Sequence, residues 1–287
     1  MSASRFQALS NGGVAVKKTA AKLFDQNMQL HFKQLGQGEP LVLLHGLFGS
    51  SDNWFGVAPK LAEKFHVFIP DLRNHGQSPH HDEMDYPLMA ADVEKFFAAQ
   101  KIESASVIGH SMGGKVAMQF ALDFPARVKK LIVVDMAPRA YERRHGKIFT
   151  ALLALDLKAF QTRAQMEEAL AAEIPSLNLR RFLLKNLGRD EQGKFFWKLN
   201  LRGVAENYSR LGEVVERRRL ALRCDGAFTG PTLFIRGGKS DYTCDADVAE
   251  IHRLFPAAEI QTIAAASHWV HADAPEEFVR LVLDFLG

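Results

Sequence analysis

The chain has 287 residues, of which 47% are hydrophobic and 24% charged, and its formal net charge at pH 7 is +3. These values are typical of a globular enzyme with one large domain, or with one domain that carries an insertion. No apolar run approaches the roughly 18 residues of a membrane-spanning helix, so we expect no membrane span.

Residues 1–27 are expected to form a loosely attached N-terminal extension, because a Ser-Asn-Gly-Gly break at 10–13 interrupts them. They mix lysines with apolar residues and lack the uninterrupted apolar core of a signal peptide. Two cysteines, Cys224 and Cys244, are too few for a disulfide framework. We therefore expect a cytoplasmic protein with two free thiols, and a lone disulfide between them is the alternative.

From Met28 onward, short apolar runs alternate with helical patterns. The runs predict strands at 29–35, 41–44, 65–70, 105–108, 131–134, 231–236 and 259–263. Helical patterns occupy 87–99, 114–122, 246–254 and 275–286. The run at 41–44 is apolar throughout, as expected of a strand buried on both faces. This alternation predicts an α/β fold with a mostly parallel sheet and helices on both faces.

The rhythm changes at residue 139, after which helical periodicity continues to 226 without a convincing strand. We interpret 139–228 as a helical cap inserted between two strands of a core made of 28–138 and 229–287. Residues 139–219 contain 17 Lys and Arg against 10 Asp and Glu. This excess favours steering of an anionic substrate, although a solvated helical surface is the simpler interpretation.

The sequence at 109–113 is Gly-His-Ser-Met-Gly, which matches the pattern G-x-S-x-G. A short β-prone run precedes it and a helical pattern follows it. A serine between glycines at such a strand-to-helix turn occupies a nucleophile elbow, where its hydroxyl is exposed at the end of the sheet. This setting predicts Ser111 as a catalytic nucleophile.

A serine hydroxyl is a poor nucleophile until a base accepts its proton, and a carboxylate should orient that base. His268 is the predicted base, because it lies in the loop between the last strand and the final helix. His271, three residues later, is the local competitor.

Two carboxylates compete for the role of the acid. Asp135 ends the strand that follows the nucleophile helix, and Asp241 follows the penultimate strand. The usual spacing after the penultimate strand is a glycine, two residues and then the acid, which places Ser240 rather than Asp241 at that position. We favour Asp135 as the acid and keep Asp241 as the alternative. If either carboxylate is not catalytic, its simplest structural role is to cap the segment that follows it.

An oxyanion hole requires two backbone N–H groups that point at the developing charge. Met112, directly after the nucleophile, is expected to supply one of them. Leu47, in the loop after the 41–44 strand, is expected to supply the other, with Phe48 as the alternative. His45 is expected to anchor that loop by hydrogen bonds, since it has no partner at a spacing suited to a metal.

Other polar clusters have simpler interpretations than catalysis. Asp71 and Arg73 are expected to form a local charge pair, which leaves Asp71 and His75 outside the site. The basic clusters at 143–145 and 180–181 suit phosphate binding, but solvated helices explain them as well.

Five short motifs give the chain a family resemblance. They are HGLFGS at 45–50, DLRNHG at 71–76, GHSMGGK at 109–115, DMAP at 135–138 and HWVH at 268–271. Together they resemble the YbfF-type esterases of bacteria and their mitochondrial relatives, a branch of the α/β-hydrolase superfamily, over residues 28–287. The resemblance implies hydrolysis of a carboxylic ester or thioester through an acyl-serine intermediate, without a cofactor or a metal. It also supports Asp135, since this branch resembles enzymes whose acid follows the strand after the nucleophile helix.

The predicted partner is therefore a small-molecule acyl ester or thioester, with acyl-CoA as a candidate, and not a nucleic acid. Related haloalkane dehalogenases and epoxide hydrolases use an aspartate nucleophile, so Ser111 argues against both. Two alternatives stay open. One is hydrolysis of a lactone or a carbon–carbon bond with the same triad, and the other is a ligand-binding protein without turnover.

Overall fold

The computed structural model of the chain describes residues 28–215 and 226–287. The predicted N-terminal extension, Cys224 and part of the predicted cap lie outside the described residues.

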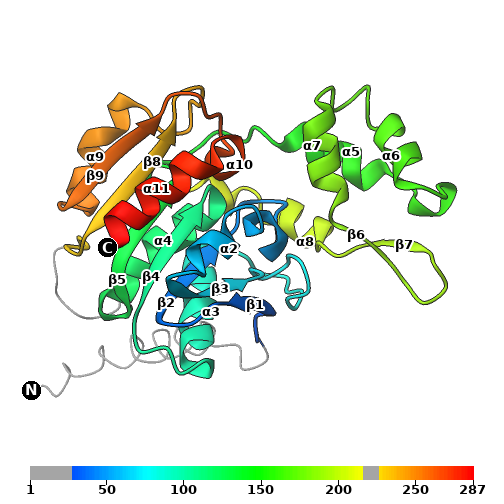
Figure 1. Cartoon of the computed structure of the whole chain (residues 1–287). Helices are drawn as coiled ribbons and strands as arrows, with labels where there is room; N and C mark the ends of the chain where they lie inside the picture. The colour runs from blue at the N-terminus through cyan, green and yellow to red at the C-terminus, as the bar shows by residue number, and fades with distance from the viewer. Residues whose placement is uncertain (1–27, 216–225) are drawn as a thin grey trace, which may run out of the picture.

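A seven-stranded sheet forms the centre of the molecule, with the strand order β1-β3-β2-β4-β5-β8-β9 (Figure 1). Its strands are β1 Phe32–Leu35, β2 Glu39–Leu44, β3 Phe65–Pro70, β4 Ala105–His110, β5 Val128–Val134, β8 Thr232–Gly237 and β9 Ala258–Ile263. Neighbouring strands are parallel except β1, which pairs antiparallel with β3. The predicted mostly parallel sheet is confirmed.

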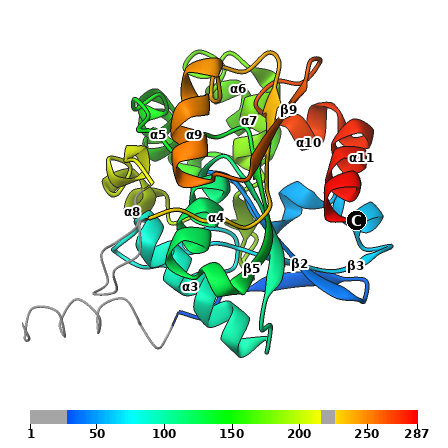
Figure 2. The same cartoon turned by 90° about the vertical axis from the view of Figure 1, so that its left-hand side faces the viewer.

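Helices cover both faces of the sheet, which explains why central strands such as β2 and β5 end in apolar runs without alternation. In β2, Val42 and Leu44 pack into one core cluster, whereas Leu41 and Leu43 pack into the other. The first cluster contains residues of α3 Tyr86–Ala99, α4 Met112–Asp123 and α9 Val248–Leu254. The second contains residues of α2 Ala58–Leu61 and α11 Pro275–Leu286. Figure 2 shows α3, α4 and α9 on one side of the sheet and α11 on the other.

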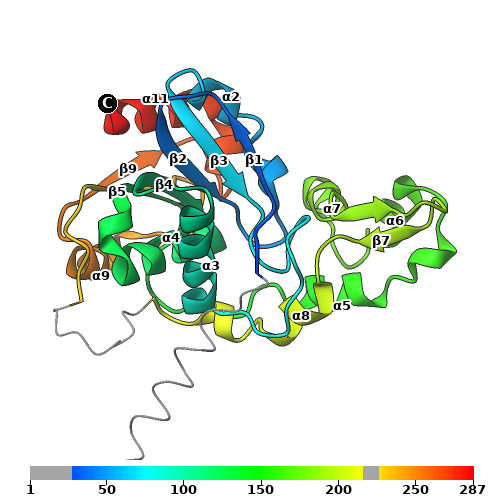
Figure 3. The same ribbon diagram turned by 90° about the horizontal axis from the view of Figure 1, so that it is seen from below.

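Between β5 and β8 the chain leaves the sheet for a segment of short elements, which we call the inserted segment. It comprises α5 Gly146–Ala154, α6 Arg163–Ala169, α7 Leu177–Leu184, β6 Leu187–Arg189, β7 Phe195–Trp197 and α8 Leu201–Glu206. Figures 1 and 3 show it extending to one side of the sheet, with α8 close to the core. The remaining helix, α10 Val270–Asp273, directly precedes α11.

The expectation that this segment holds no strand is wrong. β6 and β7 pair as an antiparallel hairpin, with Leu187 opposite Trp197. Its turn is built by Asp190, whose carboxylate accepts the N–H groups of Gln192 and Lys194, and by Gly193, whose φ is 75°. Strands of three residues are too short to produce a readable alternation of apolar and polar positions. Among the described helices, none combines the length and the apolar character needed to cross a membrane.

Candidate active site

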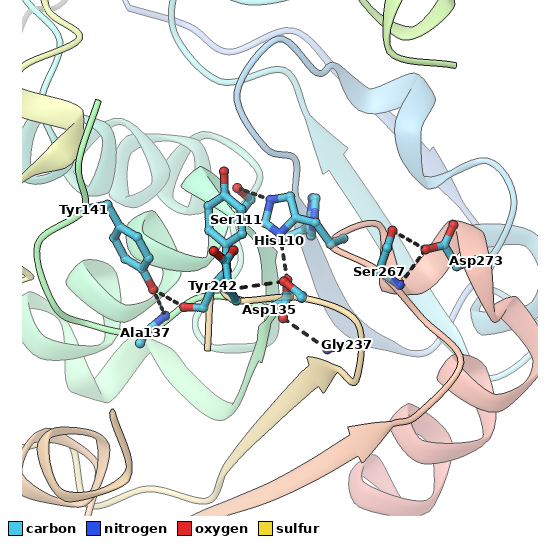
Figure 4. A network of polar contacts seen from close by, with 12 residues as sticks. His110, Ser111, Asp135, Ala137, Tyr141, Gly237, Tyr242, Ser267 and Asp273 are labelled. Atoms are coloured by element: carbon cyan, nitrogen blue, oxygen red, sulfur yellow. Dashed lines mark hydrogen bonds and ion pairs between the residues drawn. The ribbon is translucent and has the colours of Figure 1, made fainter. Parts of the chain in front are cut away.

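The predicted site residues meet at the carboxyl ends of the parallel strands. Ser111 follows β4, Asp135 follows β5, and His268 lies in the loop between β9 and α10. Open α/β sheets bind their ligands at this edge. Figure 4 shows Ser111, Asp135 and the polar groups around them from close by.

Ser111 has φ 54° and ψ −120°, a backbone conformation that residues with a side chain rarely adopt. Its N–H donates to the carbonyl of Val134 on β5 at 3.1 Å, and its carbonyl accepts the N–H of Lys115 in α4 at 3.1 Å. The sheet and the helix therefore hold the strained residue from both sides, as in a nucleophile elbow.

The two glycines of the motif allow this turn to form. A Cβ on Gly109 would lie 2.2 Å from the carbonyl oxygen of Gly113, and a Cβ on Gly113 would lie 2.3 Å from that of Leu44. Both obstacles are backbone atoms, which no side-chain rotation removes. The pattern G-x-S-x-G is thus a steric requirement of this turn.

His268 lies between the serine and the aspartate. Its Nε2 is 2.9 Å from Ser111 Oγ, and its Nδ1 is 2.7 Å from Asp135 Oδ2. With its proton on Nδ1, the ring donates to Asp135 and accepts the serine hydroxyl, which is the tautomer that a general base requires. The side chain of His268 is 17% exposed, whereas that of Asp135 is fully buried.

Two further groups donate to the Asp135 carboxylate. The N–H of Gly237 lies 3.1 Å from Oδ1, and the hydroxyl of Ser240 donates to Oδ2. Ser240 is the residue that occupies the usual acid position after β8. In this chain the position therefore holds a donor to Asp135 in place of a carboxylate.

Asp241 pairs with Arg144. Its two carboxylate oxygens each lie 2.7 Å from Nη1 of Arg144, and its side chain is 72% exposed. This contact with Arg144 holds the pKa of the Asp241 carboxyl below its usual range. The structure thus brings Asp135, and not Asp241, to the histidine.

Two residues that contact His268 were missed by the sequence analysis. His110 Nε2–H donates to the backbone carbonyl of His268 at 2.8 Å, and the Tyr242 ring stacks on the His268 ring with centroids 3.8 Å apart. The carbonyl of Tyr242 accepts the hydroxyl of Tyr141 (Figure 4). His110 lies inside the recognised motif, and that position was the available signal. Tyr242 has no sequence signal, because only the fold places it over the histidine.

The competitor His271 is buried and lines the larger of two cavities beside Ser111, but it does not contact the serine hydroxyl among the hydrogen bonds of the described residues. Its ring stacks on Trp54 with centroids 4.5 Å apart, and its Nδ1 has no partner among the described residues. Burial, with a smaller effect of His268, lowers the pKa of His271 to about 4. A neutral buried imidazole of this kind makes the fold sensitive to acid.

We expect His271→Phe to reduce that sensitivity. Because the pKa of His271 is about 6.5 in the unfolded chain and about 4 in the folded protein, the unfolded chain binds more protons between these values. The stability from neutral His271 is therefore complete above about pH 6.5 and is lost as the pH falls towards 4. Between neutral pH and about pH 5, the free energy of unfolding should therefore fall by about 2 kcal/mol less in the variant than in the wild type. Urea titrations at both pH values measure this, and equal losses in both proteins would contradict it.

The loop after β2 carries the second predicted oxyanion donor. His45 Nδ1–H donates to the Gly46 carbonyl at 2.9 Å and its Nε2 accepts the N–H of Leu72 at 2.9 Å, so the expected anchoring role is confirmed. A Cβ on Gly46 would lie 3.2 Å from Ser111 Cβ, which places the loop against the serine. Among the hydrogen bonds of the described residues, none uses the N–H of Leu47, Phe48 or Met112.

Two cavities open beside Ser111. The larger has a volume of about 240 Å³ and the smaller about 50 Å³. Both are lined mainly by apolar and aromatic side chains, and Leu47, Ser111, His145 and Tyr242 line both. Within the described residues, no group of three or more His, Cys, Asp or Glu has the arrangement of a metal site.

The expected charge pair between Asp71 and Arg73 is wrong. Arg73 reaches α3 and donates from Nε and Nη2 to the buried carboxylate of Asp92, at 2.6 and 2.8 Å. Asp71 accepts the N–H groups of Ser51 and Gln77 at 2.6 and 2.9 Å. A buried carboxylate on a helix needs a bidentate cation, and no sequence pattern linked Arg73 to a residue nineteen positions later. Neither Asp71 nor His75 lines the two cavities.

Most arginines of the two basic clusters, 143–145 and 180–181, already bind groups of this chain. Arg180 donates to the carbonyl of Ile174, Arg181 pairs with Glu167, and Arg144 pairs with Asp241. Arg143 and Arg144 also line the smaller cavity. Only the first cluster thus lies near Ser111.

Comparisons with known proteins show which family the chain belongs to. A family model described as alpha/beta hydrolase fold matches residues 39–275. The chain is 37% identical over 263 residues to the sn-1-specific diacylglycerol lipase ABHD11 of Danio rerio, covering 89% of this chain and 80% of the relative. It is 36% identical over 249 residues to the esterase YbfF of Escherichia coli K12, covering 86% and 93%. A solved structure titled marine microorganism esterase is 42% identical, with a TM-score of 0.85, and covers 90% of this chain and 99% of its own. The predicted resemblance to YbfF-type esterases is confirmed.

Proposed function

Because this chain belongs to the alpha/beta hydrolase fold family, we propose that it is a serine hydrolase of carboxylic esters, with Ser111, His268 and Asp135 as its catalytic triad. The observation that carries the proposal is the continuous chain of hydrogen bonds from Ser111 Oγ through the His268 ring to Asp135. Activity as a carboxylic ester hydrolase also agrees with the names of its relatives, which include an esterase and a diacylglycerol lipase.

Acylation begins when Ser111 Oγ attacks the ester carbonyl carbon and its proton passes to His268 Nε2. The buried Asp135 carboxylate stabilises the resulting imidazolium, and the Gly237 N–H and the Ser240 hydroxyl keep that carboxylate in place. The N–H groups of Leu47 and Met112 stabilise the oxyanion, with Phe48 as the alternative to Leu47. His268 then protonates the leaving alcohol, and the acyl group stays on Ser111.

Deacylation repeats these steps with water as the nucleophile. His268 Nε2 accepts a proton from the water as its oxygen attacks the acyl carbon. The second tetrahedral intermediate collapses, the proton returns to Ser111 Oγ, and the carboxylic acid leaves.

The proposal is tested by p-nitrophenyl esters with acyl groups from acetyl to palmitoyl. We expect release of p-nitrophenol in proportion to enzyme concentration. If the folded protein hydrolyses none of these esters, the result would favour a lactone or a carbon–carbon bond as the substrate, or a ligand-binding protein without turnover. A fluorophosphonate probe separates these cases, because a binding protein without an activated serine stays unlabelled.

Thioester hydrolysis is the second candidate, since the same triad cleaves thioesters. The observation that favours it is the basic cluster at 143–145 beside Ser111. His145 lines both cavities, and Arg143 and Arg144 next to it are exposed, where arginines suit the phosphates of an acyl-CoA. Arg144 is paired with Asp241, which leaves Arg143 as the stronger candidate for that contact.

If Arg143 binds acyl-CoA phosphates, its replacement should raise KM selectively. We expect Arg143→Ala to raise KM for acetyl-CoA about tenfold, the effect of losing a contact worth about 1.4 kcal/mol, and to leave p-nitrophenyl acetate unaffected. Added salt should weaken acetyl-CoA turnover in the wild type as it screens the contact. Turnover of acetyl-CoA that responds neither to salt nor to the variant would exclude this role of Arg143.

A further inference from the structure

The two cavities beside Ser111 differ in their relation to His268. The larger cavity is lined by His268 itself and by Trp269, the next residue. The smaller cavity is lined by Met112, whose N–H is a proposed oxyanion donor, and does not include His268. Ser111 therefore lies between the two cavities, and His268 lines only the larger of them.

The position of His268 determines which cavity takes the alcohol half of an ester and which takes the acyl half. After accepting the serine proton, His268 Nε2 must donate it to the leaving oxygen, so that oxygen has to lie within hydrogen-bond reach of the ring. The alcohol half consequently extends into the cavity that His268 lines. The carbonyl oxygen points towards the oxyanion donors, and the acyl chain is directed into the remaining cavity.

The smaller cavity limits the length of that chain. Its volume is about 50 Å³, and since a water-sized group needs about 10–15 Å³, it has room for about four such groups. The larger cavity, with about 240 Å³, has several times that space. The smaller cavity thus encloses only a short acyl chain. A longer acyl chain would extend past the exposed Glu142 and Arg143 into solvent, whereas the larger cavity has room for a long chain on the alcohol side.

The walls of the smaller cavity are fixed in place. Tyr86 OH donates to the Leu211 carbonyl at 2.6 Å. Lys115 Nζ donates to the carbonyls of Arg139, at 2.6 Å, and of Glu213. These bonds connect α3 and α4 to residues at the start of the inserted segment and to residues that follow α8. Expansion of the cavity for a longer chain would break hydrogen bonds of the buried Tyr86 and Lys115 side chains, which is costly.

On these grounds, and resting on the proposed esterase function, we propose that the preferred substrates are esters of short acyl groups with larger apolar or aromatic alcohols. The acyl group occupies the cavity lined by Met112 and Leu211. The alcohol occupies the cavity lined by His268, Phe182 and Trp269.

Octyl acetate and ethyl octanoate test this assignment, because they are isomers that differ only in which side of the ester carries the long chain. We expect kcat/KM to be at least tenfold higher for octyl acetate. Hydrolysis of ethyl octanoate at an equal or higher rate would overturn the assignment while leaving the esterase proposal intact. If the wild type hydrolyses neither isomer nor p-nitrophenyl acetate, the esterase proposal itself fails and the assignment fails with it.

A matched pair of variants tests which cavity determines the preference between the two isomers. Leu211→Ala widens the smaller cavity and Leu179→Ala widens the larger one by the same change. We expect Leu211→Ala to lower the ratio of kcat/KM for octyl acetate over ethyl octanoate at least threefold, and Leu179→Ala not to lower it. The opposite pattern would overturn the assignment. Circular dichroism verifies that both variants fold, and the comparison of isomers in the wild type does not depend on them.

Discussion

Replacing Ser111 with alanine is expected to lower kcat for p-nitrophenyl acetate by at least about 10⁴-fold, because the loss of a triad nucleophile removes the covalent route. Ser111 Oγ is the hydroxyl that His268 Nε2 contacts, at 2.9 Å. Alanine differs from serine only by the loss of Oγ and has the same Cβ at this strained position, so it should leave the fold intact. Steady-state kinetics on matched concentrations of wild type and variant measure the loss.

The control is the thermal unfolding of the same two proteins. Equal melting temperatures with a lost kcat attribute the effect to chemistry. A variant that folds and keeps more than about a tenth of the wild-type kcat would contradict the role of Ser111, since residual triad activity is far smaller.

The second large effect is expected at the acid. Asp135→Asn should lower kcat by about 10³–10⁴-fold, because the amide no longer stabilises the imidazolium and favours the wrong tautomer of His268. Asp135 Oδ2 lies 2.7 Å from His268 Nδ1, whereas Asp241 is exposed and paired with Arg144. The matched change Asp241→Asn should therefore alter kcat by less than about threefold, as expected for an exposed ion pair.

These two variants also separate the competing assignments. A large loss in Asp241→Asn with a small one in Asp135→Asn would assign the acid to the position after β8. Small losses in both would mean that the carboxylates share the role. Both results would require His268 to turn away from the Ser240 and Gly237 side of the site.

Much of this fold was predictable because its signals are local. The strand β3 and the helix α11 have the predicted bounds. An apolar run interrupted only by His66 marks the strand, and a proline at the first helical position marks the helix. The nucleophile turn was also predictable, because close backbone contacts at Gly109 and Gly113 exclude other residues there. Steric requirements of this kind leave a direct trace in the sequence.

Other features depend on contacts that no local pattern records. The pairing of Arg73 with Asp92 joins a loop to a helix, and the stacking of Tyr242 on His268 joins two loops. The hairpin of β6 and β7 is defined by the pairing of two strands of three residues, which are too short to show a periodicity. The choice between Asp135 and Asp241 is of the same kind, since both follow strands that end at the same edge. The cytoplasmic location and the boundaries of the cap stay predictions.

The covalent intermediate provides the most direct test of the account. We would mix the protein with p-nitrophenyl acetate, quench it in acid within the first turnover, and map the added mass by peptide mass spectrometry. The account predicts an acetyl group on Ser111, absent from Ser111→Ala. Turnover of the ester without an adduct on Ser111, or an equal adduct elsewhere in Ser111→Ala with activity retained, would contradict it.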